Sequence, residues 1–230
     1  GYGYTLQEDP ALPPMMFSRD EMEAFSLESH MRAQRAQDEG RFDSEIVAMP
    51  ELDKDETIRP NSTLEGMAGL DPLQEGGRIT AAVSSQTCDG SSAMIIASEY
   101  AVKRYNLKPR ARIHHMSVRA DDPIWMLTAP IPACEHALKK AGMSWDQIDL
   151  VEINEAFASV PMAWLKDTGF PHEKTNVNGG AIALGHPIGA SGARIMVTLL
   201  NALEYHGLKR GVAAICIGGG EGTAIAIERV

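Results

Sequence analysis

The feature that most constrains the fold is a pair of apolar segments near the carboxyl end of the chain. Residues 212–217 and 223–227 are almost continuously apolar, and the connection between them holds four glycines. Apolar runs of this length, bounded by turn residues, are typical of strands that are buried on both faces. The spacing predicts an antiparallel hairpin at the core of a sheet.

Helical patterns alternate with short apolar runs in the rest of the chain. The patterns predict helices over 18–40, 91–105, 132–141, 156–168 and 191–206, and extended segments over 79–83, 109–118 and 150–153. The first helix has both ends marked, because Ser18 and Glu21 form a capping box and Gly40 is placed to end it. Residues 43–80 lose this periodicity and are expected to be irregular. Strands that alternate with helices predict an α/β layered fold.

The acidic charge is concentrated in the first third of the chain. Residues 1–80 hold 17 Asp and Glu against 7 Lys and Arg, whereas residues 81–230 hold 14 of each. This break in charge indicates two structural units. The formal net charge of −10 argues against nucleic acid as a partner.

Several protein classes are excluded by composition. No apolar run reaches the roughly 18 residues that would span a membrane, and no basic and apolar leader opens the chain. The three cysteines, Cys88, Cys134 and Cys216, are too widely spaced for a CxxC metal site or a disulfide framework, which favours a reducing compartment. We also find no spacing of metal ligands, and we expect no metal. The chain opens Gly1-Tyr2 without a methionine, so we expect it to be cut from a longer protein.

Two glycine-rich segments each present one reactive side chain. His186 lies among glycines 179, 180, 185, 189 and 192, and the helix predicted after it directs its amide dipole toward this loop. The alternative is a buried structural histidine in a tight turn. Cys216 precedes Gly218-Gly219-Gly220, whose bare amides beside a thiol would suit an oxyanion hole. The alternative here is a small buried apolar residue.

Asn154 and Glu155 end a predicted buried strand, where α/β folds place ligands and where polar groups need partners. A simple helix cap is the alternative for Asn154. The remaining histidines carry less weight, because His114 and His115 alternate across a strand. The other four are expected to be solvated: His30, His136, His172 and His206. A basic group is expected to be solvated surface as well: Lys103, Arg104, Lys108, Arg110 and Arg112.

Three motifs in one order resemble the carboxyl half of the thiolases, which are acyl-CoA acetyltransferases. They are NEAFA at 154–158, GGAIALGHPIGASGAR at 179–194 and CIGGG at 216–220. The resemblance implies a thiolase-like α/β layered fold, with a mixed five-stranded sheet between helices and an irregular α-rich loop domain. It also implies three parts: a CoA-binding loop domain at 1–78, the last strand and helix of the amino-terminal domain at 79–106, and the carboxyl-terminal domain at 107–230.

The same resemblance assigns roles to residues. His186 is similar to the histidine that activates the nucleophilic thiol, and Cys216 to the acid/base that moves a proton at the acetyl-CoA methyl group. Asn154 resembles the residue that anchors a water in the oxyanion hole shared with His186, and the amide of Gly218 one donor of a second oxyanion hole. The predicted contacts to the acyl chain and to coenzyme A come from Phe157, Ser85 and Arg59.

The family's nucleophilic cysteine belongs to a domain that this sequence lacks, and Cys88 is not where the family places it. The resemblance therefore implies an acetyl-CoA C-acyltransferase with a ping-pong mechanism, of which this chain alone is inactive. Two alternatives remain: a non-catalytic scaffold half that pairs with a nucleophile-bearing chain, and a ketoacyl-synthase-like enzyme or thiolase-like aldolase. Cys216 in CxGGG argues against the second of these.

The resemblance also implies the protein's surroundings. The expected ligands are acyl-CoA and CoA, with coenzyme A as a substrate and no cofactor. We expect a bacterial cytoplasmic homodimer or homotetramer, without membrane or nucleic-acid partners. Residues 121–132, which include Trp125, are expected to border the acyl pocket and to suit a bulky or steroid-like group.

Overall fold

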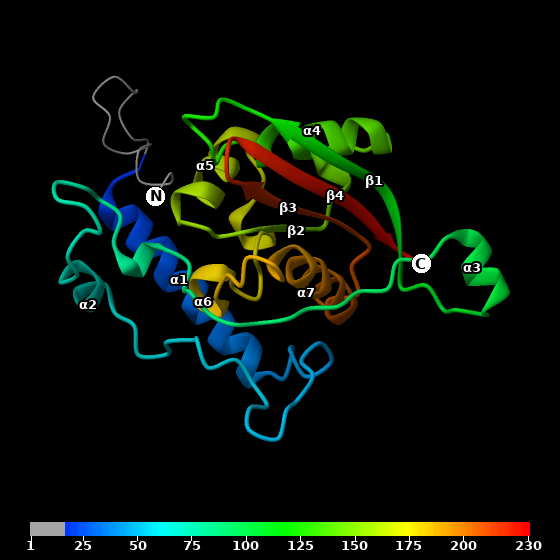
Figure 1. The fold of residues 1–230 in the computed structure, drawn as a ribbon, viewed down its shortest axis with the longest axis horizontal. Coiled ribbons are helices and arrows are strands. Elements are labelled where there is room, and N and C mark those ends of the chain that lie inside the picture. The colour runs from blue at the N-terminus through cyan, green and yellow to red at the C-terminus, as the bar shows by residue number, and fades with distance from the viewer. Residues whose placement is uncertain (1–16) are drawn as a thin grey trace.

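The computed structural model describes residues 17–230. The first 16 residues, which include the Gly-Tyr start and part of the predicted loop domain, lie outside the described residues. Figure 1 shows the helices α1 (Arg19–Asp38), α2 (Leu64–Ala68), α3 (Glu99–Arg104), α4 (Pro130–Ala141), α5 (Ser159–Thr168), α6 (Ala181–Leu184) and α7 (Ser191–Tyr205), and the strands β1 (Ala111–Ala120), β2 (Leu150–Ile153), β3 (Arg210–Ile217) and β4 (Glu221–Arg229). Short 3₁₀ turns cover Ala81–Val83, Trp145–Gln147 and His172–Lys174.

The sheet has the order β1-β4-β3-β2, so the predicted hairpin β3–β4 occupies its centre. β4 is antiparallel to both of its neighbours, whereas β2 is parallel to β3. The expectation of five strands is wrong in detail. Within residues 17–230 the sheet has four strands. Beside β2, where a fifth strand would lie, there is only a single parallel bridge from Val151 to Thr175.

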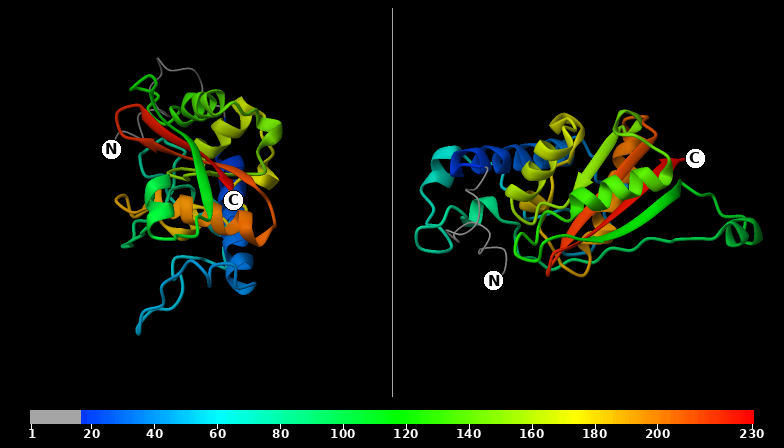
Figure 2. Two further views of the ribbon diagram at one scale, coloured as in Figure 1. Left: turned by 90° about the vertical axis from the view of Figure 1, so that its right-hand side faces the viewer. Right: turned by 90° about the horizontal axis from the view of Figure 1, so that it is seen from above.

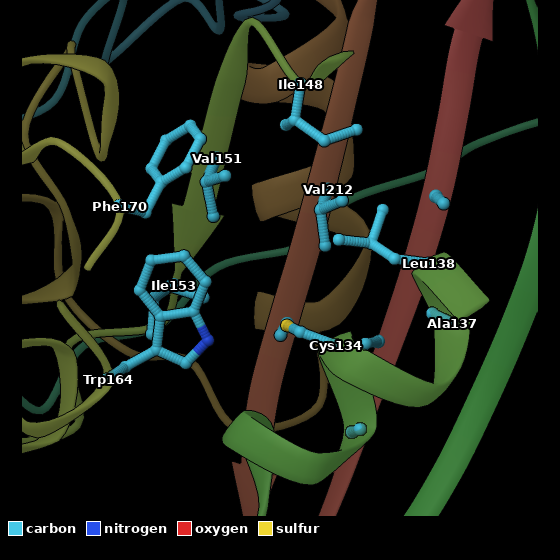
Figure 3. Packing of buried hydrophobic residues seen from close by; sticks show 13 residues of the cluster. Cys134, Ala137, Leu138, Ile148, Val151, Ile153, Trp164, Phe170 and Val212 are labelled. Atoms are coloured by element: carbon cyan, nitrogen blue, oxygen red, sulfur yellow. The ribbon is translucent and has the colours of Figure 1, made fainter. Parts of the chain in front are cut away.

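Helices cover both faces of this sheet, which gives the α/β layers that the sequence predicts (Figures 1 and 2). On one face, Cys134 and Leu138 of α4 and Trp164 of α5 pack against the strand residues Val151 and Val212 (Figure 3). On the other face, α7 buries an apolar stripe against the strands, with Leu199 and Leu203 fully enclosed. The sheet residues are apolar on both sides because both sides are covered.

The first helix is built as the capping pattern predicts. The Ser18 hydroxyl accepts from the backbone N–H of Glu21, and the Glu21 carboxylate accepts from the backbone N–H of Ser18. α1 then lies beside α6 and α2, with Met22 and Phe25 packed against Ile182. The acidic first part of the chain is thereby fixed to the segment that leads to His186.

Residues 79–106 differ most from the predictions. The strand expected over 79–83 is replaced by an isolated bridge of Thr80 with Pro72 and the 3₁₀ turn Ala81–Val83, and the helix expected over 91–105 is reduced to α3. Ser98 caps α3 through the N–H of Ala101, which sets its late start. Before it the chain is extended, and Ile95 is 90% exposed. The apolar run at 92–97 lacks the amphipathic period of a helix, and no strand within residues 17–230 pairs with it. Figure 2 shows α3 standing away from the body of the molecule.

No helix among the described residues is both long and apolar enough to cross a membrane.

Candidate active site

The parallel strands β2 and β3 bring two of the predicted site residues to one edge of the sheet. The N–H of Asn154, directly after β2, donates to the carbonyl of Ala214 in β3. Cys216 lies two residues farther along β3, in register with Gly222 of β4. Parallel strands end on the same side of a sheet, so Asn154 and Cys216 share its carboxyl edge.

His186 reaches this edge from the loop after α6. Its Nε2 lies 3.2 Å from Nδ2 of Asn154, and its backbone N–H donates to the carbonyl of Gln86. Gly185 has a φ of +80°, and a Cβ there would lie 2.3 Å from the Cys88 sulfur. The loop can therefore pass this point only with a glycine, which accounts for the glycine before His186.

Ser191 fixes the proton on the imidazole of His186. The Ser191 hydroxyl donates to the carbonyl of Pro187 over 3.0 Å, and its Oγ lies 2.5 Å from Nδ1 of His186. A hydroxyl that gives its one hydrogen to Pro187 accepts the hydrogen of Nδ1, and an Asn154 amide that donates to Nε2 fits the same tautomer. Nε2 then carries a lone pair toward Asn154, which gives His186 the tautomer of a general base.

The charge states of the two reactive groups follow from burial. Burial, helped by the nearby Arg194 guanidinium, lowers the pKa of His186 and keeps the imidazole neutral near pH 7. Burial raises the pKa of Cys216 to about 11, so this thiol holds its proton. One group is ready to accept a proton and the other is ready to give one.

The turn after Cys216 exposes backbone to solvent. Gly218 and Gly219 are exposed, whereas Gly220 packs on the backbone of the β1–α4 connection and its carbonyl accepts from the N–H of Asp121. That connection includes Trp125 and Met126, the segment predicted to border an acyl pocket. It thus lies against the glycine turn that follows Cys216.

The three predicted contact residues lie around the same loop. The N–H of Ser85 donates to the carbonyl of Ala156, and the preceding residue forms a bridge with Phe157. Arg59 is exposed, and its Nε donates to the side-chain oxygen of Gln86 over 3.2 Å. The Gln86 amide in turn donates to carbonyls of α6. Gln86 therefore ties the segments of Arg59 and Ser85 to the His186 loop.

A hollow of about 320 Å³ lies between α1 and the Arg59 segment. It is lined by Leu27, His30, Met31, Gln34, Arg35, Asp38, Glu39, Arg59 and Pro60. The prediction that His30 is solvated is wrong, because it is 4% exposed and its Nδ1 accepts from the N–H of Arg59. Burial lowers the pKa of His30 to about 4, so this imidazole is neutral at pH 7.

None of the three cysteines has the environment of a nucleophile. Burial raises the pKa of Cys88, raises that of Cys134 to about 12 and raises that of Cys216 to about 11. A nucleophilic cysteine instead needs a lowered thiol pKa and access to substrate. Cys134 lacks access too, since it is fully buried where α4 packs against the sheet.

The histidines away from this edge have partners of their own, whereas the predicted basic group is exposed as expected: Lys103, Arg104, Lys108, Arg110 and Arg112. His114 contacts Glu228 and His115 packs on the ring of His136, so the adjacent pair points to separate neighbours as predicted. Within residues 17–230, no cluster of His, Cys, Asp and Glu could hold a metal ion. Sequence reasoning missed Ser191 and Gln86. A serine at the start of the helix that follows the histidine loop is the signal that could have found Ser191.

Comparison with known proteins identifies the chain. The model of the thiolase carboxyl-terminal domain matches residues 107–229, and that of the thiolase amino-terminal domain matches residues 7–100. The chain belongs to the thiolase family. It is 54% identical over 217 residues to the steroid 3-ketoacyl-CoA thiolase FadA6 of Mycobacterium tuberculosis, covering 93% of this chain and 53% of that protein. A 3-ketoacyl-CoA thiolase of Psychrobacter cryohalolentis is 48% identical, with 93% and 58% covered.

Solved structures of thiolases show the same fold. Human mitochondrial 3-ketoacyl-CoA thiolase in complex with CoA superposes with a TM-score of 0.88 at 38% identity, over 98% of this chain and 61% of that one. The acetyl-CoA acetyltransferase of Bacillus anthracis gives 0.88 at 37% identity, over 98% and 62%. The chain thus spans somewhat more than half the length of the thiolases that it matches.

Proposed function

We propose that this chain supplies the proton-transfer and oxyanion side of a thiolase active site, which cleaves or forms 3-oxoacyl-CoA by acyl transfer to coenzyme A. The observation that carries this proposal is the meeting of His186 with Asn154 at the sheet edge that Cys216 shares. Membership of the thiolase family supports the reaction class.

In thiolysis, the neutral His186 takes the proton of a nucleophilic thiol, since its Nε2 carries the free lone pair. The thiolate attacks the 3-oxo carbonyl, and the carbon–carbon bond breaks to give an acyl-enzyme and the enolate of acetyl-CoA. The protonated Cys216 gives its hydrogen to that enolate, and its thiolate then removes the proton of incoming CoA. The CoA thiolate attacks the acyl-enzyme and releases the nucleophilic thiolate, which takes its proton back from His186. A thiol whose pKa is raised to about 11 starts this cycle as an acid.

Two sets of donors would stabilise the negative oxygens of this ping-pong cycle. Asn154 has a buried side-chain oxygen without a protein partner, which suits the anchoring of a water beside protonated His186. The exposed amide of Gly218 is available to a tetrahedral intermediate on the acyl-enzyme. In this proposal Ser85 and Phe157 contact the substrate on its way to His186. Arg59 borders the hollow beside α1, where its positive charge would bind the anionic end of CoA.

The nucleophile comes from outside these 230 residues in this proposal, and the raised pKa values of all three cysteines support that assignment. The chain is then inactive alone and works as part of an assembly that contains a nucleophile-bearing domain, a homodimer or homotetramer in the cytoplasm of a bacterium. Coenzyme A is a substrate, and no cofactor is required. The relative described as a steroid 3-ketoacyl-CoA thiolase favours a bulky acyl group, as does the segment of Trp125, whose residues 121–123 pack on Gly220 of the glycine turn.

Thiolysis by the full polypeptide that carries this chain tests the proposal. The substrates are acetoacetyl-CoA, a long-chain 3-oxoacyl-CoA and a cyclic 3-oxoacyl-CoA, each followed by loss of the 3-oxo thioester absorbance. We expect CoA-dependent cleavage that is abolished by His186→Ala. CoA-independent hydrolysis, or no cleavage of any of the three by a folded protein, would contradict it.

A further inference from the structure

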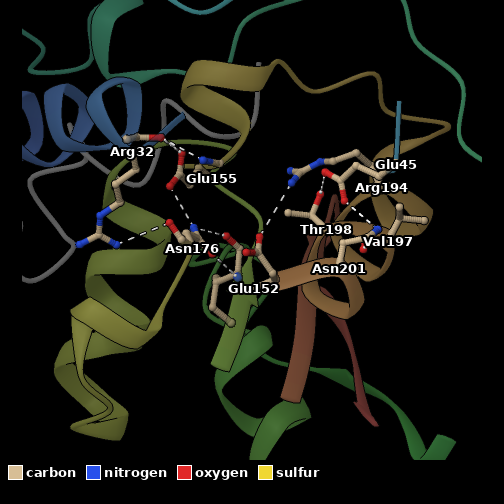
Figure 4. A network of polar contacts seen from close by, with 12 residues as sticks. Arg32, Glu45, Glu152, Glu155, Asn176, Arg194, Val197, Thr198 and Asn201 are labelled. Atoms are coloured by element: carbon tan, nitrogen blue, oxygen red, sulfur yellow. Dashed lines mark hydrogen bonds and ion pairs between the residues drawn. The ribbon is translucent and has the colours of Figure 1, made fainter. Parts of the chain in front are cut away.

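Glu155 is the most completely engaged buried carboxylate in the part of the chain that the structure describes. It follows Asn154 at the end of β2 and is 1% exposed. Its Oε2 accepts from the Ser29 hydroxyl over 2.7 Å and from the N–H of Ile182 over 3.2 Å, and its Oε1 accepts from Nδ2 of Asn176 over 2.9 Å (Figure 4). The three donors belong to α1 (Ser29), to α6 (Ile182) and to the loop that precedes α6 (Asn176).

The carboxylate also lies flat against the start of the histidine loop. A Cβ built on Gly180 would be 2.3–2.6 Å from the carboxyl atoms of Glu155, so only a glycine fits. The N–H of Gly180 donates to the Ser29 hydroxyl, which itself donates to Glu155. Gly180 is the residue before α6 and offers no capping side chain. Glu155, at the end of β2, therefore caps the start of α6 in place of a local side chain.

His186 lies two residues beyond the last residue of α6. α6 is a single turn, so its orientation fixes where the chain leaves it. Glu155 holds the start of that turn, and the residue before Glu155 holds the imidazole itself through its side-chain amide. Two successive residues at the end of β2 thus hold the two ends of the segment 182–186: Glu155 binds the N–H of Ile182, and Asn154 contacts the imidazole of His186.

We propose that Glu155 is a positioning residue, which holds α6 and the 176–182 loop so that His186 and Asn154 meet; this rests on the proposed function of those two residues. A carboxylate is required because every neighbour is a donor: a hydroxyl, a side-chain amide and a backbone N–H. A glutamine in its place would turn an NH₂ group toward one of these donors. The loop would then shift, and small shifts of a reacting group lower the rate.

Glu152 provides a matched control in the same strand. It is 2% exposed and, like Glu155, a buried carboxyl group, but it pairs with Arg194, whose Nη1 lies 3.8 Å from its Oε2 (Figure 4). Its side chain forms no hydrogen bond with residues 176–186. Glu152→Gln and Glu155→Gln each replace a carboxyl group by an amide of the same size at the same depth, and they differ in what that group holds.

The experiment measures kcat and KM for thiolysis in the full polypeptide, and the ¹³C-histidine spectrum of His186. We expect Glu155→Gln to lower kcat by about 10- to 100-fold with KM within about 3-fold, and to shift the His186 resonances. Glu152→Gln should leave kcat within about 3-fold and the His186 resonances in place. A folded Glu155→Gln protein with unchanged kcat and unchanged His186 resonances would overturn the proposal.

Ser29→Ala is the second variant, for the case in which Glu155→Gln does not fold. It keeps the carboxylate but removes the hydroxyl that links it to Gly180, so kcat should fall by about 3- to 10-fold with the same sign of His186 shift. Wild-type kinetics and an unshifted spectrum for Ser29→Ala would count against the proposal. If His186 shifts in these variants while even the wild type shows no thiolysis, the positioning role stands and the proposed function fails.

Discussion

Residues 92–97 and strand β3 have similar apolar sequences and opposite surroundings. Ile95 and Ile96 are 90% and 69% exposed on an extended segment that pairs with no strand among the described residues, whereas Val212 of β3 is fully buried between two strands and two helix layers. Apolar composition therefore marks a segment that can be buried, but the partner strands decide whether it is. The carboxyl-terminal part of the chain supplies those partner strands itself, whereas residues 92–97 have none within residues 17–230.

The two half-exposed cysteines repeat the same contrast. Cys216 ends the paired strand β3 beside a glycine turn, and Cys88 lies in the segment that precedes the unpaired run. Both have raised thiol pKa values because of burial. In the proposed mechanism only the thiol that the completed sheet positions takes part in proton transfer.

The largest expected effect compares these two cysteines. Cys216→Ala should lower kcat for thiolysis by roughly 10²–10⁴-fold, the usual loss on removing a general acid/base. Cys88→Ser, measured in the same full polypeptide, should stay within about 10-fold, since the hydroxyl fits beside Gly185 and carries no proton of the reaction. Equal losses from both variants would remove the distinction between the two segments.

A second prediction compares burial directly. Ile227→Ala in β4 empties a site that is 2% exposed and should cost about 2–5 kcal/mol of unfolding free energy. Ile95→Ala should change the unfolding free energy of the 230-residue chain by less than about 0.5 kcal/mol, as surface substitutions do. Both are measured by urea denaturation. A large loss from Ile95→Ala would show that residues 92–97 are buried in solution.

The smallest expected effect concerns buried charge in the completed sheet. Burial raises the pKa of Glu152 to about 8, above its unfolded value near 4.5. The folded state then binds more protons between these pH values, so Glu152 costs stability as the pH rises from 4.5 to 8. Glu152→Gln should reduce the stability lost between pH 5 and pH 8 by on the order of 3 kcal/mol, seen by denaturation at both pH values. An unchanged difference would place the Glu152 carboxylate in solvent.

Helix α1 and most of the carboxyl-terminal part could be predicted well from sequence, because their signals are local. Capping by Ser18, the glycine after α4 and the apolar hairpin each specify their structure from neighbouring residues. The segment at 91–105 could not be, since its conformation depends on strands elsewhere. An apolar run rich in Ala and Ile is compatible with helix or strand until a partner is known.

The site residues also divide into those that local sequence signals could predict and those that depend on distant contacts. Glycines around His186 and Cys216 were visible because close backbone approach leaves a trace in the sequence. The burial of His30 was not, because the Arg59 backbone that donates to it is 29 residues away. Ser191 and Glu155 act through contacts across the loop, and no spacing rule connects Glu155 to Ser29.

The central claim is that this chain completes a thiolase site without holding its nucleophile, and the position of the acyl-enzyme tests it most directly. The 230-residue chain is incubated with acetoacetyl-CoA, alone and with a polypeptide that carries a thiolase amino-terminal domain, and acylated peptides are located by mass spectrometry. The account predicts acylation on a cysteine of the added polypeptide and none on this chain. Acylation of Cys88 or Cys216 in the chain alone, together with turnover, would contradict it.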